Sequence, residues 1–182
     1  DGHSLSVKTD SNLHEYIITE VNGNTLDIEV KDHHRLKPTE EIEVFITFKE
    51  IDEIEASSSS RVYTDSNIEV SNLEIDVSSS GDVELDIEAD EITGDCSSGG
   101  SIKLKGETEK CRLDVSSGGD IEAKDLTSKE VEADASSGGD ISIIVLEKLT
   151  ANVSSGGDFD FYGDPDEIQI DESSGGNVDH KE

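Results

Sequence analysis

Residues 115–122 read Val-Ser-Ser-Gly-Gly-Asp-Ile-Glu, and versions of this block recur through the C-terminal two-thirds of the chain. The Ser-Ser pairs begin at Ser57, Ser78, Ser97, Ser116, Ser136, Ser154 and Ser173, which gives steps of 21, 19, 19, 20, 18 and 19 residues. A nearly constant period of this size is typical of solenoids, in which each repeat stacks on its neighbour. The repeat therefore predicts stacked coils.

Apolar residues stand at fixed distances on both sides of the block. Five, three and one places before the first serine, for example, lie Leu149, Ala151 and Val153. After the block the alternation resumes, as at Val83 and Leu85. A period of two is that of a strand with one buried face. Each coil is thus predicted to run as strand, Ser-Ser-Gly-Gly corner, strand and polar return.

These parallel strands are joined by crossover connections, and such connections are right-handed in nearly all cases. We therefore predict an all-β fold, a right-handed parallel β-helix with about 19 residues per coil and an irregular N-terminal cap region. Paired glycines suit the corner because a tight turn that stacks closely favours positive φ and no Cβ. The serines are predicted to be structural, with hydroxyls bonded along the column and to the turn backbone.

The first 56 residues carry no copy of the block, but they contain strand signals. Residues 16–21 and 26–30 flank Asn22-Gly23-Asn24, which is a hairpin signal, and residues 42–48 alternate again. We expect a single β-helix domain over 1–182, with irregular N-terminal coils and a cap in 1–56 and regular coils in 57–182. A cap is expected because the ends of a solenoid expose unpaired strand edges.

The aspartates that follow the glycines are the candidate calcium ligands. They are Asp82, Asp120, Asp140 and Asp158. Carboxylates one rung apart repel, so either water and backbone N–H groups screen them or a cation lies between them. The calcium-binding nonapeptide Gly-Gly-x-Gly-x-Asp is absent, and the period here is twice as long. Loose condensation of cations is therefore favoured over a built metal site.

Two further groups of residues could carry chemistry. His33 and His34 beside Asp32 could bind a metal, but neighbours in a strand point to opposite faces and no third ligand is placed. Cys96 and Cys111 are predicted to lie about four residues apart along adjacent rungs, roughly 13 Å. A disulfide needs Cα atoms within about 7 Å, so both are predicted to be buried free thiols.

The blocks at 115–122 and 135–142, preceded by residues 42–62, resemble the head GIN domain of putative auto-transporter adhesins, a family found mainly in Bacteroidetes. The resemblance covers the chain from about Val7 onward and rests on repetition. It implies a β-helix related in shape to pectin lyases, an adhesion role and an extracytoplasmic location: secreted, periplasmic or as an outer-membrane lipoprotein. It brings no catalytic residues. Because the chain begins at Asp1 and lacks methionine, we expect that a leader or tag has been removed.

Charge narrows the classes of partner. The chain has 45 acidic and 14 basic residues, a net charge of -31. Phosphate contacts to nucleic acid or anionic lipid would therefore meet long-range repulsion. No apolar run approaches the length that spans a membrane. We expect an extracellular protein or glycan that is neutral, basic or cation-bridged, and a homo-oligomer stays open.

These observations predict a non-catalytic surface module without a cofactor, whose flat faces bind a protein or glycan. The alternative is a carbohydrate-active enzyme, a lyase or hydrolase on a pectin-lyase-like β-helix. Such enzymes need a groove with carboxylates or a metal, a Lys or Arg beside them, and aromatic platforms. Tryptophan is absent, and Arg35, Arg61 and Arg112 are far apart in the repeat. Ice binding is a weaker third hypothesis, because flat ice-binding ladders are typically built from threonine.

Overall fold

The structure, a computed structural model, describes residues 2–31, 36, 38–39 and 41–182. Their contacts divide the chain into two compact units, Asp1–Glu50 and Ile51–Glu182. The stack of coils thus begins before Ser57, because Ile54 and Ala56 already occupy core positions in it. That the two units form one domain stays a prediction.

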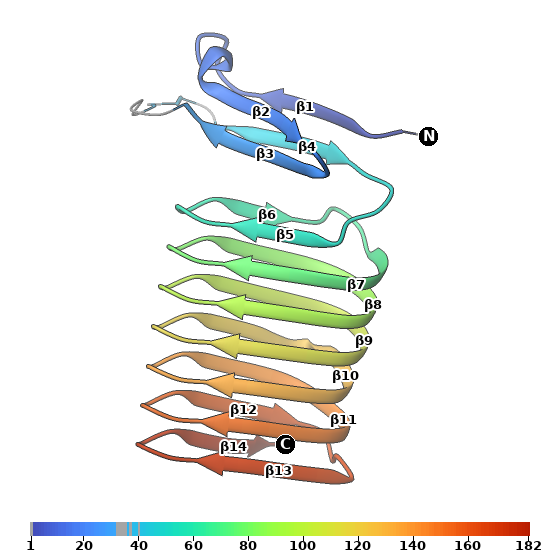
Figure 1. Cartoon of the computed structure of the whole chain (residues 1–182), viewed down its shortest axis with the longest axis vertical. Coiled ribbons are helices and arrows are strands. Elements are labelled where there is room, and N and C mark those ends of the chain that lie inside the picture. The colour runs from blue at the N-terminus through green and yellow to red at the C-terminus, as the bar shows by residue number, and fades with distance from the viewer. Residues whose placement is uncertain (1, 32–35, 37, 40) are drawn as a thin grey trace. The chain divides into compact units, whose positions relative to one another are not determined.

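The second unit is built from ten strands in parallel pairs. The strands are β5 (Glu53–Ala56), β6 (Arg61–Tyr63), β7 (Ile68–Val77), β8 (Asp82–Cys96), β9 (Ser101–Val115), β10 (Asp120–Ala135), β11 (Asp140–Val153), β12 (Asp158–Tyr162), β13 (Glu167–Glu172) and β14 (Asn177–Lys181). Figure 1 shows them as coils stacked one on another. This confirms the predicted all-β parallel solenoid with repeats about 19 residues apart. Its right-handed sense stays a prediction.

Like residues lie over like in the core, as the aligned columns predicted. Ile121 of β10 is paired with Ile102 of β9 and with Ile141 of β11, and all three are almost completely buried. Cys96 and Cys111 are buried free thiols, which confirms that prediction. Burial raises the pKa of the Cys111 thiol to about 12. Both cysteines therefore act as small apolar side chains in the stack.

The return is not the polar segment that the sequence predicted in the coils of β8 to β11, whereas β6 and β7, and likewise β12 and β13, are joined by non-strand segments with exposed polar residues such as Asp65 and Asp164. β8 to β11 continue through it, and Ile87, Leu126 and Val145 are fully buried there. Buried and exposed residues alternate along each of these strands, and the alternation shifts by one residue where two adjacent residues are exposed, as at Asp90 and Glu91. The chain turns the second edge of the coil at this point, so apolar side chains on both of its arms reach the core.

The Ser-Ser-Gly-Gly corner is a tight turn in which the two glycines have different roles. In one copy Ser98 (φ 52°) and Gly99 (φ 70°) are both left-handed, and the Gly100 N–H donates to the carbonyl oxygen of Ser97 at 2.9 Å. These features are those of a type I′ turn. Gly100 has no positive φ, but a Cβ on it would lie 2.9 Å from Val77 Cγ1 and 3.0 Å from Val77 O in the preceding coil.

Backbone groups, not serine hydroxyls, join the corners along the stack. The Ser97 N–H donates to Val77 O at 2.9 Å, and the equivalent bond recurs from coil to coil. Among the described corner serines only the hydroxyl of Ser60 has a hydrogen bond, which it accepts from the Ser57 N–H at 3.1 Å. The predicted ladder of hydroxyls is therefore not formed in the described corners, which are joined from coil to coil by backbone hydrogen bonds.

The first unit consists of antiparallel pairs. β1 (Ser4–Lys8) pairs with β4 (Glu43–Thr47), and β2 (Ile17–Asn22) pairs with β3 (Thr25–Val30) after a short 3-10 turn, η1 (His14–Tyr16). The β2–β3 hairpin turns at Gly23, with φ 66°, as its sequence predicted. A capping role for this unit stays a prediction. Asp32, His33, His34 and Arg35 lie outside the described residues.

Candidate functional site

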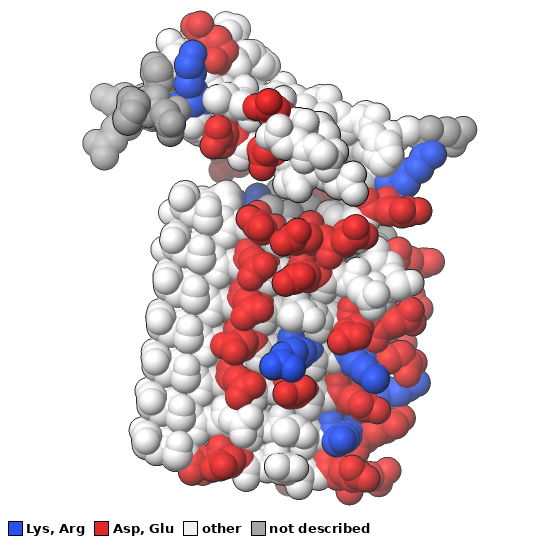
Figure 2. Space-filling model, in the orientation of Figure 1, with Lys and Arg blue, Asp and Glu red and all other residues white. Residues whose placement is uncertain are grey.

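The most regular polar feature of the solenoid is a row of carboxylates beside the corner, which we call the acidic row. It stands two residues before the first serine of five successive coils: Glu55, Asp76, Asp95, Asp114 and Asp134. The strand register places each member next to the following one. Figure 2 shows a column of acidic side chains along the uncharged corner. At the strand spacing the rungs are about 4.8 Å apart.

The strands expose these residues because their neighbours on either side point into the core. Asp95, for example, lies between the buried positions Gly94 and Cys96. Its pKa is raised, first by partial burial and then by the charges of Asp114 and Asp76 on the adjacent rungs. The row therefore concentrates negative charge, and an ionised row is under mutual repulsion.

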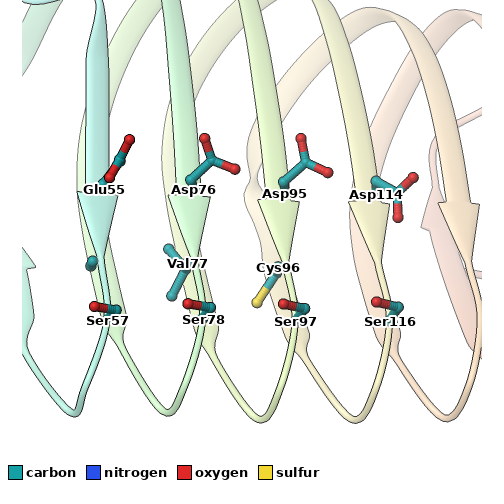
Figure 3. Close-up of a pocket in the computed structure, with 11 residues that line it drawn as sticks. Glu55, Ser57, Asp76, Val77, Ser78, Asp95, Cys96, Ser97, Asp114 and Ser116 are labelled. Atoms are coloured by element: carbon teal, nitrogen blue, oxygen red, sulfur yellow. The ribbon is translucent and has the colours of Figure 1, made fainter.

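The acidic row borders a shallow concavity of about 500 Å³. Its charged lining consists of Glu55, Asp76, Asp95 and Asp114, and one serine per coil lies beside each carboxylate, namely Ser57, Ser78, Ser97 and Ser116. Figure 3 shows the carboxylates and hydroxyls in two parallel lines, one of each per rung. Among the described residues, no Lys or Arg lines this concavity. A ligand here would meet acceptor oxygens repeated at the spacing of the rungs.

The four predicted calcium ligands follow the corner instead of preceding it, so they start the other strand of each coil. Asp120, Asp140 and Asp158 lie on consecutive rungs, whereas Ser101 separates Asp82 from them. Partial burial, and then the next aspartate along the column, raises the pKa of Asp120 and of Asp140. In the described part of the chain, no group of three or more His, Cys, Asp or Glu residues could hold a metal ion. Calcium binding therefore stays a prediction.

Asp82 differs from the other three in having a partner. Its carboxylate accepts a hydrogen bond from Arg61 Nε at 2.7 Å, on the rung before it. This ion pair is exposed, so it contributes little to stability. It does give Asp82 a counter-charge that a cation would otherwise supply.

A second concavity of about 500 Å³ lies at the opposite edge of the coils. It combines acidic residues such as Glu88 and Glu107 with one base, Lys129. Lys129 Nζ contacts both carboxylate oxygens of Glu109, at 2.6 and 2.7 Å. This is the arrangement that comes nearest to the lysine and carboxylates of a polysaccharide lyase. Because the ammonium group is already paired with Glu109, it is not placed to stabilise a developing anion on a substrate.

The acidic row was missed at the level of the sequence, although the same alignment contains it. The aspartate after the glycines is the more conspicuous residue because it adjoins the repeated block, and four copies have it. The column two places before the serines is more uniform, because it is acidic in every copy from Glu55 to Asp134. In a chain with 45 acidic residues, the same acidic type at one position of successive copies is the signal that distinguishes this row from the other acidic residues.

Comparison with known proteins gives a consistent result. The family model described as "Putative auto-transporter adhesin, head GIN domain" matches residues 1–165. A solved structure of a putative lipid binding protein from Parabacteroides distasonis is 26% identical, with a TM-score of 0.81, and the match covers 100% of this chain and 85% of that one. A putative adhesin from the same organism is also 26% identical, with a TM-score of 0.79 and coverage of 100% and 85%.

A putative adhesin from Bacteroides fragilis has a TM-score of 0.90 at 20% identity, over 99% of this chain and 83% of that one. That likeness concerns the fold. Among curated proteins none matches the chain. Within the described residues no helix has the length and apolar character needed to cross a membrane.

Proposed function

Since the chain belongs to the head GIN domain family of putative auto-transporter adhesins, we propose that it is a non-catalytic extracytoplasmic surface module. The proposed ligand is a protein or glycan, bound along the face that carries the acidic row. The partner is basic, or is bridged to the row by cations. Family membership supports the adhesin-like character and the location outside the cytoplasm, and the geometry of the row supports the choice of surface.

The single observation that carries the proposal is the repetition of one carboxylate per rung beside an open concavity. Glu55, Asp76, Asp95 and Asp114 present a line of acceptors on a rigid sheet. An extended ligand with cationic groups at a matching spacing would contact several rungs at once. Such multiple contacts raise the affinity and also the specificity, because like-charged partners are repelled.

The catalytic alternative finds less support. Phe159 and Phe161 are buried in the core, where they stack with ring centroids 6.2 Å apart, so neither offers a platform for a sugar. Within the part of the chain that the structure describes, no base lines the concavity beside the acidic row, and Lys129 at the other edge is paired with Glu109. A lipid partner, which the name of one structural neighbour suggests, is disfavoured for anionic headgroups by the net charge of -31.

The experiment is a glycan and extracellular-matrix array probed with the protein, with and without calcium. The test variant is Asp76→Asn/Asp95→Asn, which removes two charges from the acidic row. The matched control is Asp140→Asn/Asp158→Asn, which removes two charges from the other side of the corner. We expect binding to particular array positions that the first variant loses and the control keeps.

Three results would contradict this proposal. Binding that is equal in the wild type and in Asp76→Asn/Asp95→Asn would exclude the acidic row as the surface. Calcium-dependent binding that only the control variant loses would assign the function to the aspartates after the corner. Release of shortened products from polyuronates would favour the enzyme alternative.

A further inference from the structure

One position of the repeat changes from charged to apolar in two adjacent coils. Eight places after the first serine, five copies have a charged residue, namely Asp65, Asp86, Lys105, Lys124 and Lys181. In the two remaining copies this position is Ile144 of β11 and Tyr162 of β12. Because other coils have charged residues at the same place, the stacking of the rungs does not require apolar side chains there.

Ile144 and Tyr162 lie side by side on the outer face of the sheet. They are paired in register, and each is partly exposed, although the residue before each of them in its strand is buried. The neighbouring rungs provide Thr127 on one side of the pair and Lys181 on the other. The exposure of the pair is therefore a property of the outer face and not of an end of the stack.

A polar pair adjoins this apolar pair on the same face. Two residues earlier on the same strands are Ser142 and Asp160, which are also paired in register. Among the described residues, no hydrogen bond involves the hydroxyl of Ser142 or of Tyr162. Asp160 Oδ1 lies 3.3 Å from Lys181 Nζ, and a carboxylate can accept further hydrogen bonds. We call Ser142, Ile144, Asp160 and Tyr162 the Tyr162 patch.

The lysines that border the Tyr162 patch are paired with carboxylates. Lys124 forms an ion pair with Glu122 on one side, and Lys181 forms one with Asp179 at 2.9 Å on the other. An anionic ligand would meet the net charge of -31, and a cationic ligand would meet a lysine at either border. Charge complementarity therefore favours an uncharged ligand.

The chemistry of the two pairs distinguishes between uncharged ligands. An apolar protein segment laid over Ile144 and Tyr162 would also cover Ser142 and Asp160 and would leave them without hydrogen bonds, which is costly. A neutral sugar ring has an apolar C–H face with hydroxyl groups around it. It can therefore contact the apolar pair and satisfy the polar pair at the same time.

We propose that the Tyr162 patch binds a ring of a neutral glycan. The ring lies across the two rungs, which are roughly 4.8 Å apart, with its C–H face on Ile144 and Tyr162. Its hydroxyls exchange hydrogen bonds with Ser142 and Asp160. The patch lies on the arm after the corner, whereas the acidic row lies on the arm before it, so the inference does not rest on the proposed function.

The test is a titration of the whole, isotope-labelled chain, followed by the amide signals in nuclear magnetic resonance spectra. The probes are cellohexaose, laminarihexaose, mannohexaose and xylohexaose, with hexamers of galacturonate and of glucosamine as charged controls. We expect at least one neutral hexamer to shift the signals of Ile144 and Tyr162 saturably, and those of Asp76 and Asp95 in the acidic row to stay in place. Added salt should change this affinity by less than about two-fold, because the ligand is uncharged.

Variants of the protein locate the site. Tyr162→Ala should weaken the neutral hexamer by about ten-fold, because the platform is lost, whereas Tyr162→Phe should keep most of the affinity. Ile144→Thr keeps the branched side chain but makes it polar, and it should also weaken binding. The matched control is Tyr63→Ala, which removes a 52% exposed tyrosine that is paired with Glu84 and should leave the affinity unchanged.

A purely structural role is the competing explanation, because an aromatic residue paired with a β-branched one stabilises a sheet. A lower melting temperature of Tyr162→Ala with an unchanged affinity would establish that role and overturn the inference. Failure of all four neutral hexamers to shift the signals of the patch would also overturn it. Tighter binding of either charged hexamer than of every neutral one would show that charge, and not the platform, selects the ligand.

Discussion

Replacing Gly157 with alanine is the sharpest test of how the rungs stack. A Cβ at Gly157 would lie 2.7 Å from the carbonyl oxygen of Ala135 and 2.8 Å from its carbon. Both atoms are backbone atoms of the preceding coil, so no side-chain rotation can relieve the clash. The coils must separate locally, and two hydrogen bonds flank this point, Ser154 N–H to Ala135 O at 2.9 Å and Asp158 N–H to Gly139 O at 3.0 Å.

The expected cost follows from these contacts. Weakening two backbone hydrogen bonds costs about 1 kcal/mol each, and the residual strain adds about the same again. We therefore expect Gly157→Ala to lower the free energy of unfolding by about 2–4 kcal/mol.

The adjacent glycine provides the matched control. Gly156 has φ +75°, but a Cβ on it would have no neighbour within 4 Å. Gly156→Ala should therefore lower the free energy of unfolding by only about 1 kcal/mol, the cost of placing a residue with a Cβ in the left-handed conformation. Part of this cost is offset because alanine restricts the unfolded chain.

Equilibrium unfolding in urea, followed by circular dichroism, compares the two variants with the wild type. Hydrogen exchange at the Ser154 and Asp158 amides reports whether the loss is local to the corner. If Gly157→Ala were no more destabilising than Gly156→Ala, the second glycine would not serve close stacking, and the reasoning would be refuted.

Three further predictions concern the corner, the carboxylates and the thiols. Ser80 has a left-handed backbone with φ 62°, at the position that later coils give to glycine. Ser80→Gly should therefore raise the melting temperature, and the free energy of unfolding should increase by about 0.5 kcal/mol after the entropy cost of glycine is subtracted. A lower melting temperature would contradict this prediction. Partial burial, and then neighbouring carboxylates, raises the pKa of Asp95, Asp120 and Asp140 above 3.8, the ordinary value for an aspartate. Ionisation of these groups therefore opposes folding. The free energy of unfolding should increase as the pH falls from 7 through the raised pKa toward 3.8. Thermal unfolding at several pH values should show a smaller gain in Asp120→Asn, and an unchanged gain would refute the assignment. Cys96 and Cys111 are buried, and the pKa of the Cys111 thiol is raised to about 12. Neither thiol should therefore react with Ellman's reagent at pH 8 until the protein is denatured. Reaction of the native protein would contradict this prediction and would show that the core opens.

The coils were predictable because their signal is repeated. A single alternating segment such as residues 149–153 is ambiguous, but the same offsets in successive copies identify a buried column. The return was harder to predict. The length of the return varies between coils, and the pairing of β10 with β11 is irregular between Ala123 and Thr127. When the copies are superimposed on their serines, Leu126 is therefore out of line with the other buried return residues, Ile87 and Val145.

The first unit shows a second limit of the sequence. The β2–β3 hairpin was recognised because its turn, at Gly23, is local. The pairing of β1 with β4 joins Lys8 to Glu43, and no local signal indicates which strand meets which across such a separation. The parallel strands and core columns of the solenoid were therefore predictable, while the antiparallel partner of β4 was not.

The most direct test of the proposed function is the chemical fate of whatever the protein binds. We propose that the solenoid presents charge on its faces and binds its ligand without catalysis. Ligands retained on the array should therefore be eluted after prolonged incubation and examined by mass spectrometry, beside a sample that was never exposed to the protein. Ligands of unchanged mass, bound through the acidic row, are the predicted result. Cleaved or otherwise modified ligands would contradict it.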